Sequence, residues 1–265
     1  EIKVAQFSGY VSEHSGYHHG EASLNGAIIG LAQNYVGSNN INLLYPSGQF
    51  GTRLLGGKDA ASERYIFTYL NPLTRKIFSE LDDSVLEYLE DDGTIVEPIH
   101  YIPIIPMILV NGTKGIGTGF STDIMCYNPI QIINYLEGKL KNISEVELKT
   151  LTIEPYYKGF KGKIYSCDES RKKYIIKGCY EMLGNDKIRI TELPIGTWTQ
   201  DYKEFLESLI DNKSTKSKNS NNYIKDFNDM STDLNVEFEI TFYPGILAKL
   251  IGEKHDYGIE GIEKY

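Results

Sequence analysis

The sequence has 265 residues, of which 41% are hydrophobic and 24% charged, and a formal net charge of −9 at pH 7. This length can form two domains of ordinary size, and the composition is that of a folded protein rather than a disordered or collagen-like chain. The longest apolar run, residues 102–110, is interrupted by prolines and is far shorter than the ~20 residues that cross a bilayer, so we expect no membrane insertion. The chain begins at Glu1 without a methionine or an apolar leader, which indicates a piece of a longer protein, and no targeting signal can be read from it.

The negative charge is concentrated in one short segment. Residues 77–100 contain eight acids and no lysine or arginine, whereas residues 1–76 contain six basic and five acidic residues. The nearly neutral first third of the chain can therefore meet an anionic partner despite the overall charge.

Residues 20–37 are predicted to form an amphipathic helix that ends at Gly37. The apolar residues follow the i, i+3, i+4, i+7, i+11 spacing of one helix face, and they are Leu24, Ala27, Ile28, Leu31 and Tyr35. Residues 41–55, INLLYPSGQFGTRLL, are typical of two short strands joined at Pro46-Ser47-Gly48. A helix followed by a hairpin is the pattern of a winged helix-turn-helix module, and several other folds share it.

The next segments are short. Residues 59–63 begin with aspartate and have the pattern of a capped turn, residues 64–70 (RYIFTYL) alternate as a strand, and residues 74–78 (TRKIF) predict a short helix. Residues 102–120 combine β-branched residues with the glycines of NGTKGIGTG. This combination predicts a buried strand that runs into a glycine-shaped turn.

From about residue 130 the pattern is that of a second α+β domain without internal repeats. An amphipathic helix is predicted at 129–140, and strands at 161–166, 173–180, 187–194 and 237–242. Residues 211–222 (DNKSTKSKNSNN) contain no apolar anchor, so we expect a mobile loop there.

His18 and His19 are adjacent at the start of the first predicted helix. Adjacent residues on a regular element diverge, and no cysteine lies near in sequence, so the pair suits a metal badly. From these residues alone a structural or capping role is favoured. A helix N-terminus is also an anion site, which a protonated imidazole would strengthen, so both interpretations stay open.

GIGTG at residues 115–119 is a weak sign of a dinucleotide site, because the last glycine of G-x-G-x-x-G is missing and no clear helix follows. It is not a phosphate loop either, since no lysine followed by serine or threonine closes it. We favour a tight turn between strands and keep a nucleotide-binding enzyme as an alternative. Ile116 is an apolar side chain between glycines, where it can be presented outward as a wedge.

Arg64 and Tyr65 are a candidate pair for nucleophilic chemistry. A phenol has a pKa of about 10 and is almost wholly protonated at neutral pH, so a nucleophilic tyrosine needs a cation or metal to stabilise its phenolate. Arg53, Lys58, Arg64 and the histidines supply positive groups in the first third of the chain. On a regular strand Arg64 and Tyr65 would face opposite ways, so action on one phosphate requires a bend between them.

Four stretches of the chain carry a resemblance at fixed mutual spacing: KVAQFSGYVSEHSGYHHGEASL (3–24), LAQNYVGSNNINLLYPSGQFGTRLLGGKDAASERYIFT (31–68), VEPIHYIPIIPMILVNGTKGIGTGF (96–120) and TELPIGTWTQDYKE (191–204). Together they resemble the breakage-reunion region of eukaryotic type IIA DNA topoisomerases. The form YHHGE, in place of the YHPHGD of bacterial gyrases, favours the eukaryotic branch. Residues 140–185 and 205–265 resemble the family only loosely.

The resemblance implies an α+β chain in which a winged helix-turn-helix domain at residues 1–110, without its beginning, is followed by a mixed α/β tower domain at residues 111–265. It also implies that Tyr65 is the nucleophile that attacks a DNA phosphate, with Arg64 and His19 beside the scissile phosphate. Ile116 would be the wedge that enters between base pairs. The further DNA-binding residues expected are His18, Arg53, Lys58 and Lys114.

Two positions depart from the family pattern. Glu63 stands directly before Arg64, where relatives often have a small residue or proline, and a carboxylate there could pair with that arginine. Gly196 stands where relatives commonly have arginine, so no phosphate contact is expected from it.

The resemblance also implies cofactors and partners. Mg²⁺ and ATP would be bound by Toprim and ATPase domains of a longer chain, so we expect no metal ligands in these residues and no DNA cleavage by them alone. The expected partners are double-stranded DNA and a second copy of the protein in a homodimer, and the expected location is the nucleus. The alternative is a DNA-binding and DNA-bending module that uses the same wedge but forms no covalent complex.

Overall fold

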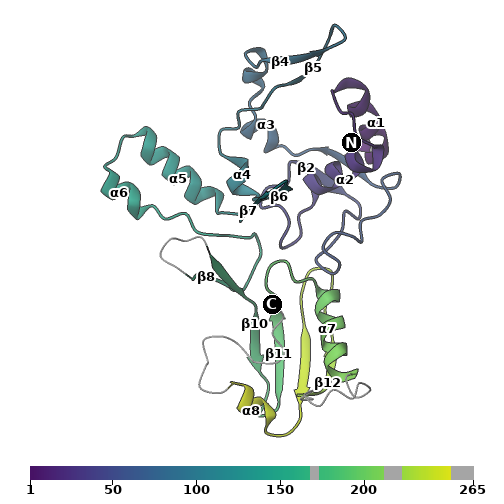
Figure 1. Cartoon of the computed structure of the whole chain (residues 1–265), viewed down its shortest axis with the longest axis vertical. Coiled ribbons are helices and arrows are strands. Elements are labelled where there is room, and N and C mark those ends of the chain that lie inside the picture. The colour runs from purple at the N-terminus through teal and green to yellow at the C-terminus, as the bar shows by residue number, and fades with distance from the viewer. Residues whose placement is uncertain (168–172, 212–222, 252–265) are drawn as a thin grey trace. The chain divides into compact units, whose positions relative to one another are not determined.

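The computed structural model describes residues 1–167, 173–211 and 223–251 (Figure 1). The chain divides into two compact units. The first unit comprises residues 1–51 and 59–158, and the second comprises residues 52–58 together with the chain from residue 159 onward. This division by contacts falls elsewhere than the expected boundary at 110/111, so the winged-helix and tower assignments stay a prediction. The α+β class is confirmed, since helices and antiparallel sheets occur in both units.

The first unit begins with two helices and a small sheet that share one core. Helices α1 (Val4–His14) and α2 (Glu21–Ala32) pack together, and strands β1 (Ile2–Lys3), β3 (Phe67–Leu70) and β2 (Leu44–Ser47) pair in that order, antiparallel. The buried residues of this first core are Val4, Leu24, Ile28, Ala32, Leu44, Phe50 and Ile66.

Helix α2 ends five residues before the predicted stop at Gly37. The side-chain amide of Asn39 donates hydrogen bonds to the carbonyls of Gly30 (2.7 Å) and Gln33 (2.9 Å). These bonds satisfy carbonyl groups at the end of the helix, which otherwise have no partner there. The chain is therefore already extended at Gln33.

The hairpin predicted at residues 41–55 is wrong. Strand β2 pairs with β3, with Tyr45 opposite Tyr69, rather than with the residues that follow Gly48. Phe50 is buried in the first core, and residues 52–58 belong to the second unit. A local alternation pattern identifies strand residues but not the partner strand, which here lies some twenty residues further along the chain.

The rest of the first unit consists of short elements around a second core. They are α3 (Thr74–Ile77), a 3₁₀ helix (Glu80–Ser84), β4 (Tyr88–Asp91), β5 (Thr94–Pro98), α4 (Met107–Val110), β6 (Thr113–Gly117), β7 (Phe120–Ile124), α5 (Pro129–Leu140) and α6 (Glu145–Thr150). The buried residues of this second core are Ile77, Ile105, Val110 and Ile132. The helices predicted at 74–78 and 129–140 are confirmed.

The buried strand predicted within residues 102–120 is wrong in its first half. Residues 107–110 form the short helix α4, which follows Pro106, and a proline has no amide to donate to a sheet. The predicted glycine turn is confirmed between β6 and β7, where Gly119 has a φ of 76°. Asn40, buried nearby, donates to the carbonyls of Val110 and Tyr127 and so joins this region to the core.

The second unit is a four-stranded antiparallel sheet with a helix on it. The strand order is β10 (Cys179–Met182), β11 (Lys187–Glu192), β13 (Phe238–Phe242) and β12 (Ile224–Asp229), and β8 (Lys163–Ser166) pairs separately with β9 (Tyr174–Lys177). Helices α7 (Thr199–Asp211) and α8 (Ile246–Ile251) complete the described elements. The strands predicted at 161–166, 187–194 and 237–242 are confirmed. The single strand predicted at 173–180 is wrong, because the chain breaks at Gly178 into β9 and β10, which belong to different sheets.

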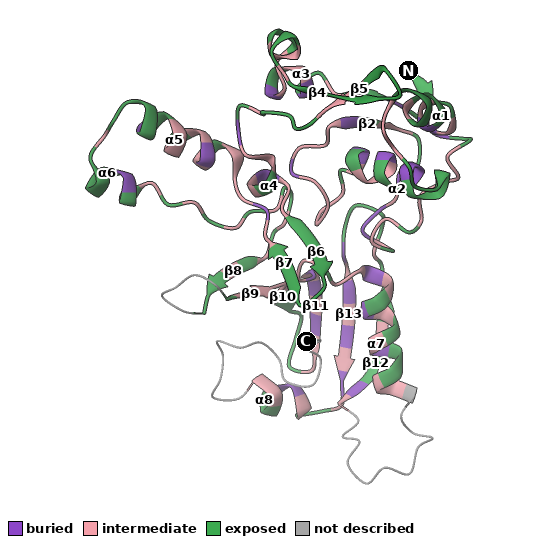
Figure 2. Cartoon of the chain, turned by 45° about the horizontal axis from the view of Figure 1, so that its top comes forward, coloured by how far each residue is buried: buried purple, intermediate pink, exposed green. Residues whose placement is uncertain are grey.

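Buried residues alternate with half-buried ones along β11 and β13, so one face of the sheet is buried (Figure 2). Ile188 and Ile190 on β11, and Phe238 and Ile240 on β13, are buried in one core with Leu206 of α7. The loop predicted at 211–222 lies outside the described residues, except for Asp211 at the end of α7. In the described part of the chain no helix is long and apolar enough to cross a membrane.

Candidate functional site

Tyr65 lies on a turn, with an exposed phenol beside a buried neighbour. Residues 63–65 form the turn, closed by a hydrogen bond from the Tyr65 amide to the Ser62 carbonyl at 2.9 Å. The Tyr65 side chain is 71% exposed, whereas Ile66 is 2% exposed within the first core. The buried isoleucine therefore fixes the backbone at the base of an accessible phenol.

Helix α1 holds the other side of this turn. The Val4 amide donates to the Ile66 carbonyl and the Ala5 amide donates to the Glu63 carbonyl, both at 3.1 Å. The first amides of a helix have no partner within the helix, so the turn supplies acceptors that α1 needs. The same bonds fix the turn on both sides of Tyr65.

Gly48 lies close to the same buried isoleucine. Its φ is +115°, and a Cβ atom placed on it would lie 2.9 Å from Cγ2 of Ile66. Glycine is the residue that adopts this backbone conformation without strain. A larger residue at 48 must therefore displace Ile66, the anchor next to the candidate nucleophile.

Arg64 lies beside the Tyr65 ring because the chain turns between them. The strand predicted from residue 64 begins only at Phe67, so the two side chains are not forced to opposite faces. The Arg64 guanidinium carbon is 5.9 Å from the Tyr65 ring centroid, and Arg64 Nε donates to Ser62 Oγ at 3.4 Å. Within the described residues Glu63 makes no ion pair with Arg64, so the arginine is available to an anion.

His18 and His19 are exposed residues in the segment between α1 and α2. The N-cap of α2 is Gly20, so neither histidine caps the helix and the capping interpretation is wrong. The His19 ring meets the Tyr17 ring edge-on, with centroids 5.4 Å apart and planes at 77°. Tyr17 packs against the first core, which also contains Ile66. His19 and Tyr65 are thus both attached to one hydrophobic core.

Tyr69, four residues after Tyr65, is a poorer candidate for the same chemistry. Its ring stacks on Tyr45, with centroids 4.7 Å apart. Desolvation first, and then the neighbouring Tyr45 and Glu1, raise the pKa of Tyr69 above that of an ordinary phenol. A raised pKa disfavours the phenolate, which is the nucleophilic form.

Strands β6 and β7 form a hairpin whose residues are almost all exposed (Figure 2). Ile116 is 91% exposed on β6, opposite Ser121 on β7. Lys114 on the same strand is exposed and lies 3.8 Å from a carboxylate oxygen of Asp123. Exposed ion pairs of this kind are weak, so Lys114 can exchange its partner for another anion.

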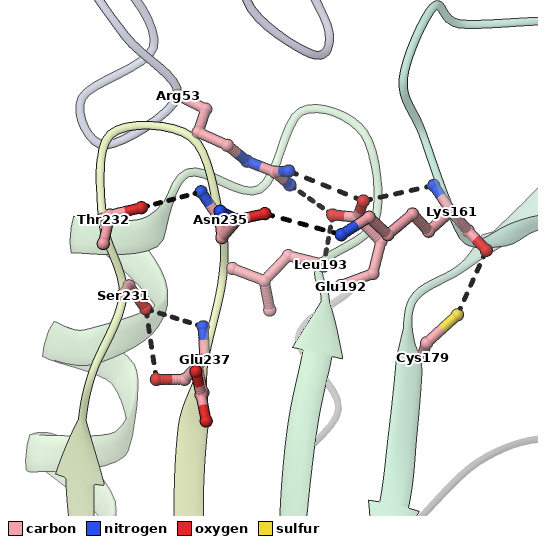
Figure 3. Close-up of polar contacts among 9 residues, drawn as sticks. All are labelled: Arg53, Lys161, Cys179, Glu192, Leu193, Ser231, Thr232, Asn235 and Glu237. Carbon is pink, nitrogen blue, oxygen red and sulfur yellow. Dashed lines mark hydrogen bonds and ion pairs between the residues drawn. The ribbon is translucent and has the colours of Figure 1, made fainter.

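Arg53 has a structural role, which corrects its prediction as a DNA-binding residue. Its guanidinium is buried and forms an ion pair with Glu192, which is 1% exposed (Figure 3). Glu192 also accepts hydrogen bonds from the amides of Lys161 at 3.2 Å and Leu193 at 2.9 Å. The short sequence pattern around Arg53 could not reveal a partner 139 residues away.

Lys58 is exposed, on the loop of residues 52–58 that belongs to the second unit. The amides of Thr199 and Gln200, at the start of α7, donate to the carbonyls of Arg53 and Leu54 at 3.3 and 3.0 Å. A Cβ atom on Gly56 would lie 2.3 Å from the ring of Trp198. This close packing fixes the loop that carries Lys58.

No group of three or more histidine, cysteine, aspartate or glutamate side chains that could hold a metal occurs among the described residues.

Comparison with known proteins identifies similar chains. The sequence profile of the DNA gyrase/topoisomerase IV A-subunit family matches residues 1–255. DNA topoisomerase 2 of Pisum sativum is 52% identical over 255 residues, which are 96% of this chain and 17% of the relative. The mitochondrial DNA topoisomerase 2 of Dictyostelium discoideum is 52% identical over 240 residues, 91% of this chain and 17% of the relative. The chain thus spans about a sixth of the length of these relatives.

A solved structure has the same fold. The crystal structure of the DNA-binding, cleavage and re-ligation domain of Plasmodium falciparum topoisomerase II matches with a TM-score of 0.85 and 48% identity, over 94% of this chain and 32% of that one. The similarity therefore extends through the later residues, where the sequence motifs predicted only a loose resemblance.

The buried ion pair predicts a stability difference that fluorescence can measure. Arg53→Ala leaves Glu192 buried without its cation, and we expect the free energy of unfolding to fall by about 3 kcal/mol. Urea denaturation followed by the fluorescence of Trp198, the single tryptophan, reports on the second unit. As the control, Lys203→Ala removes the more exposed pair with Asp229 and should cost less than about 1 kcal/mol. Equal losses would contradict the structural role of Arg53.

Proposed function

The chain belongs to the DNA gyrase/topoisomerase IV A-subunit family, and on that premise we propose that Tyr65 cleaves DNA within a type II topoisomerase. At the level of the family the chain is the breakage-reunion region of such an enzyme. The observation that carries the proposal is the 71% exposed phenol of Tyr65 beside the Arg64 guanidinium, on a turn fixed to the first core.

The proposed reaction is a reversible transesterification. The phenolic oxygen of Tyr65 loses its proton to a base or water and attacks a backbone phosphorus, and a new O–P bond forms. The bond from that phosphorus to the 3′ oxygen breaks, and the 3′ oxygen takes up a proton. The products are a 5′-phosphotyrosyl link and a free 3′-hydroxyl, and their reversal rejoins the strand without a further energy source.

Arg64 and His19 would stabilise the charge that develops on the phosphate. A guanidinium can donate two parallel hydrogen bonds to phosphate oxygens. Donors that are held in place before the reaction stabilise a transition state more than donors that must reorganise. Attachment of the Tyr65 turn and the Tyr17–His19 pair to one core supplies this preorganisation. His18, exposed beside His19, would contact the DNA backbone.

Ile116, Lys58 and Lys114 would bind and deform the DNA. An apolar side chain that is inserted between base pairs unstacks them and bends the duplex. Ile116 fits this role because it is 91% exposed on a narrow two-stranded hairpin. The exposed lysines would contact phosphates, which gives affinity without sequence preference.

The remaining parts of the enzyme would lie in a longer protein. Relatives are about six times as long as the matched region, which leaves room for the Toprim and ATPase domains that would bind Mg²⁺ and ATP. We further propose a homodimer in which two Tyr65 residues cut opposite strands in a stagger and a second duplex passes through. Nuclear location is part of the same proposal, and a mitochondrial relative at 52% identity is the competing possibility.

Covalent trapping tests the nucleophile. In a protein that includes the Toprim domain, with Mg²⁺, we expect denaturation with detergent to trap protein on DNA for the wild type and not for Tyr65→Phe. Tyr69→Phe is the matched control, since it removes an exposed hydroxyl from the same segment and should leave trapping unchanged.

Three outcomes of this assay would change the account. A covalent complex with Tyr65→Phe removes Tyr65 as the nucleophile. Binding without any trapping by the wild type favours the DNA-bending module, for which the exposed Ile116 is the specific observation. Trapping by the 265 residues alone would show that no other domain is needed.

DNA bending tests the wedge separately. Ile116→Ala should reduce the bend of a duplex labelled with two fluorophores, measured by energy transfer, while the salt dependence of binding stays the same. Lys114→Ala should leave the bend and reduce the slope of log affinity against log salt by about 1. Ile95→Ala, an exposed isoleucine on β5, is the control, and a loss of bending in that variant would contradict the wedge.

A further inference from the structure

An open groove of about 290 Å³ lies in the first unit between the end of α1 and the β4–β5 hairpin. It is separate from the turn that carries Tyr65, since no residue from 63 to 66 lines it. Three tyrosine rings, one histidine and three charged side chains make up most of its wall, namely Tyr10, Tyr88, Tyr101, His14, Arg75, Asp83 and Glu97.

The aromatic walls are held in place by their own contacts. The Tyr10 ring stacks on His14, with centroids 4.1 Å apart and planes at 18°. The Tyr88 hydroxyl donates to the Asp83 carbonyl at 2.8 Å. The Tyr101 ring meets Phe78 edge-on, with centroids 5.8 Å apart. Three tyrosine rings with fixed orientations therefore line one groove, and the face of an aromatic ring attracts a cation.

The charges of the groove leave one carboxylate for a ligand. Arg75 is committed to Asp83 at 2.6 Å and to Glu80 at 3.3 Å. Glu97 Oε2 accepts a hydrogen bond from the Gly16 amide at 3.0 Å. Among the residues that the structure describes, Oε1 of Glu97 has no hydrogen-bond partner. This oxygen is the available acceptor in a groove whose other fixed charges are paired.

We infer that this groove binds a lysine side chain on an extended segment of a partner protein. The ammonium would donate to Oε1 of Glu97 and lie against the faces of Tyr10, Tyr88 and Tyr101, while its aliphatic stem packs on Val96. An ammonium is favoured over a guanidinium, because a guanidinium pairs best with both oxygens of a carboxylate and one oxygen of Glu97 is already bonded.

The surroundings of the groove favour a basic protein segment and exclude nucleic acid. Residues 77–100 carry eight acids without a lysine or arginine, so a phosphate backbone would be repelled. Among the described residues the β4–β5 sheet has two strands, so each strand has an edge that a partner strand can approach. Leu89 and Ile95 on this hairpin are exposed and can contact apolar residues that flank the lysine.

A peptide titration of the 265-residue chain tests the inference. The probe is a nine-residue peptide with one central lysine between apolar residues, and the reference peptide has norleucine in place of lysine. We expect the lysine peptide to shift the Gly16 amide signal in two-dimensional NMR spectra and the norleucine peptide to leave it unchanged. No shift with the lysine peptide, or equal shifts with both peptides, would overturn the inference.

Matched variants distinguish binding in the groove from attraction of the peptide by the overall negative charge of the hairpin. Glu97→Gln keeps an oxygen that accepts from the Gly16 amide but removes the charge, and it should weaken binding about fivefold. Glu90→Gln removes the same charge from an exposed residue of the same hairpin that does not line the groove, and it should have no effect. Tyr10→Leu should weaken binding about threefold through the loss of one aromatic face.

Two outcomes of the variant series would overturn the inference. Equal losses for Glu97→Gln and Glu90→Gln would assign the binding to diffuse charge. If the lysine peptide binds the 265-residue chain but not the longer protein, a segment of the longer protein occupies the groove and a partner protein does not. Because these readouts do not involve DNA or Tyr65, their failure would leave the proposed function untouched.

Discussion

The burial of Ile66 is the constraint on which the candidate site depends. A nucleophile must be accessible, yet its position must be fixed to a fraction of an ångström, and a single residue cannot meet both demands. The chain divides the task between neighbours: Ile66 is 2% exposed in the first core and Tyr65 is 71% exposed at its edge. The first two amides of α1 donate hydrogen bonds to the carbonyls of Ile66 and Glu63. The turn thus supplies acceptors that the helix start lacks, and the helix start fixes the turn in place.

Two other candidate residues, His19 and Lys58, are also exposed side chains on a fixed support. His19 is held through the ring of Tyr17, which packs on the core that contains Ile66. Lys58 is held by a loop whose carbonyls accept from the start of α7 and whose arginine is paired with a buried glutamate. Ile116 differs, since its support is the two-stranded β6–β7 hairpin, an arrangement that suits the proposed insertion of this side chain between base pairs.

The sequence predicted elements whose signals are local and missed those that depend on distant partners. The amphipathic pattern of residues 129–140 is local and predicts the helix correctly, and the structure adds that the Asn128 side chain caps it. The hairpin at 41–55 failed because β2 pairs with β3, and the first helix was predicted too long because Asn39 caps it. Arg53 was assigned to DNA because nothing near it in sequence points to Glu192. The motif TELPIGTWTQDYKE contained Glu192, but its burial becomes visible only in the folded unit.

The most direct test of this account is the rate of covalent complex formation by Gly48→Ala in a protein that includes the Toprim domain. The added methyl group would lie 2.9 Å from Ile66, so the anchor and the Tyr65 turn must move. We predict a rate at least about tenfold lower, with unchanged DNA affinity, because a small displacement of a nucleophile is costly. Gly9→Ala, whose added Cβ meets nothing within 4 Å, should react at the wild-type rate. A wild-type rate for Gly48→Ala would contradict the claim that Ile66 positions the nucleophile.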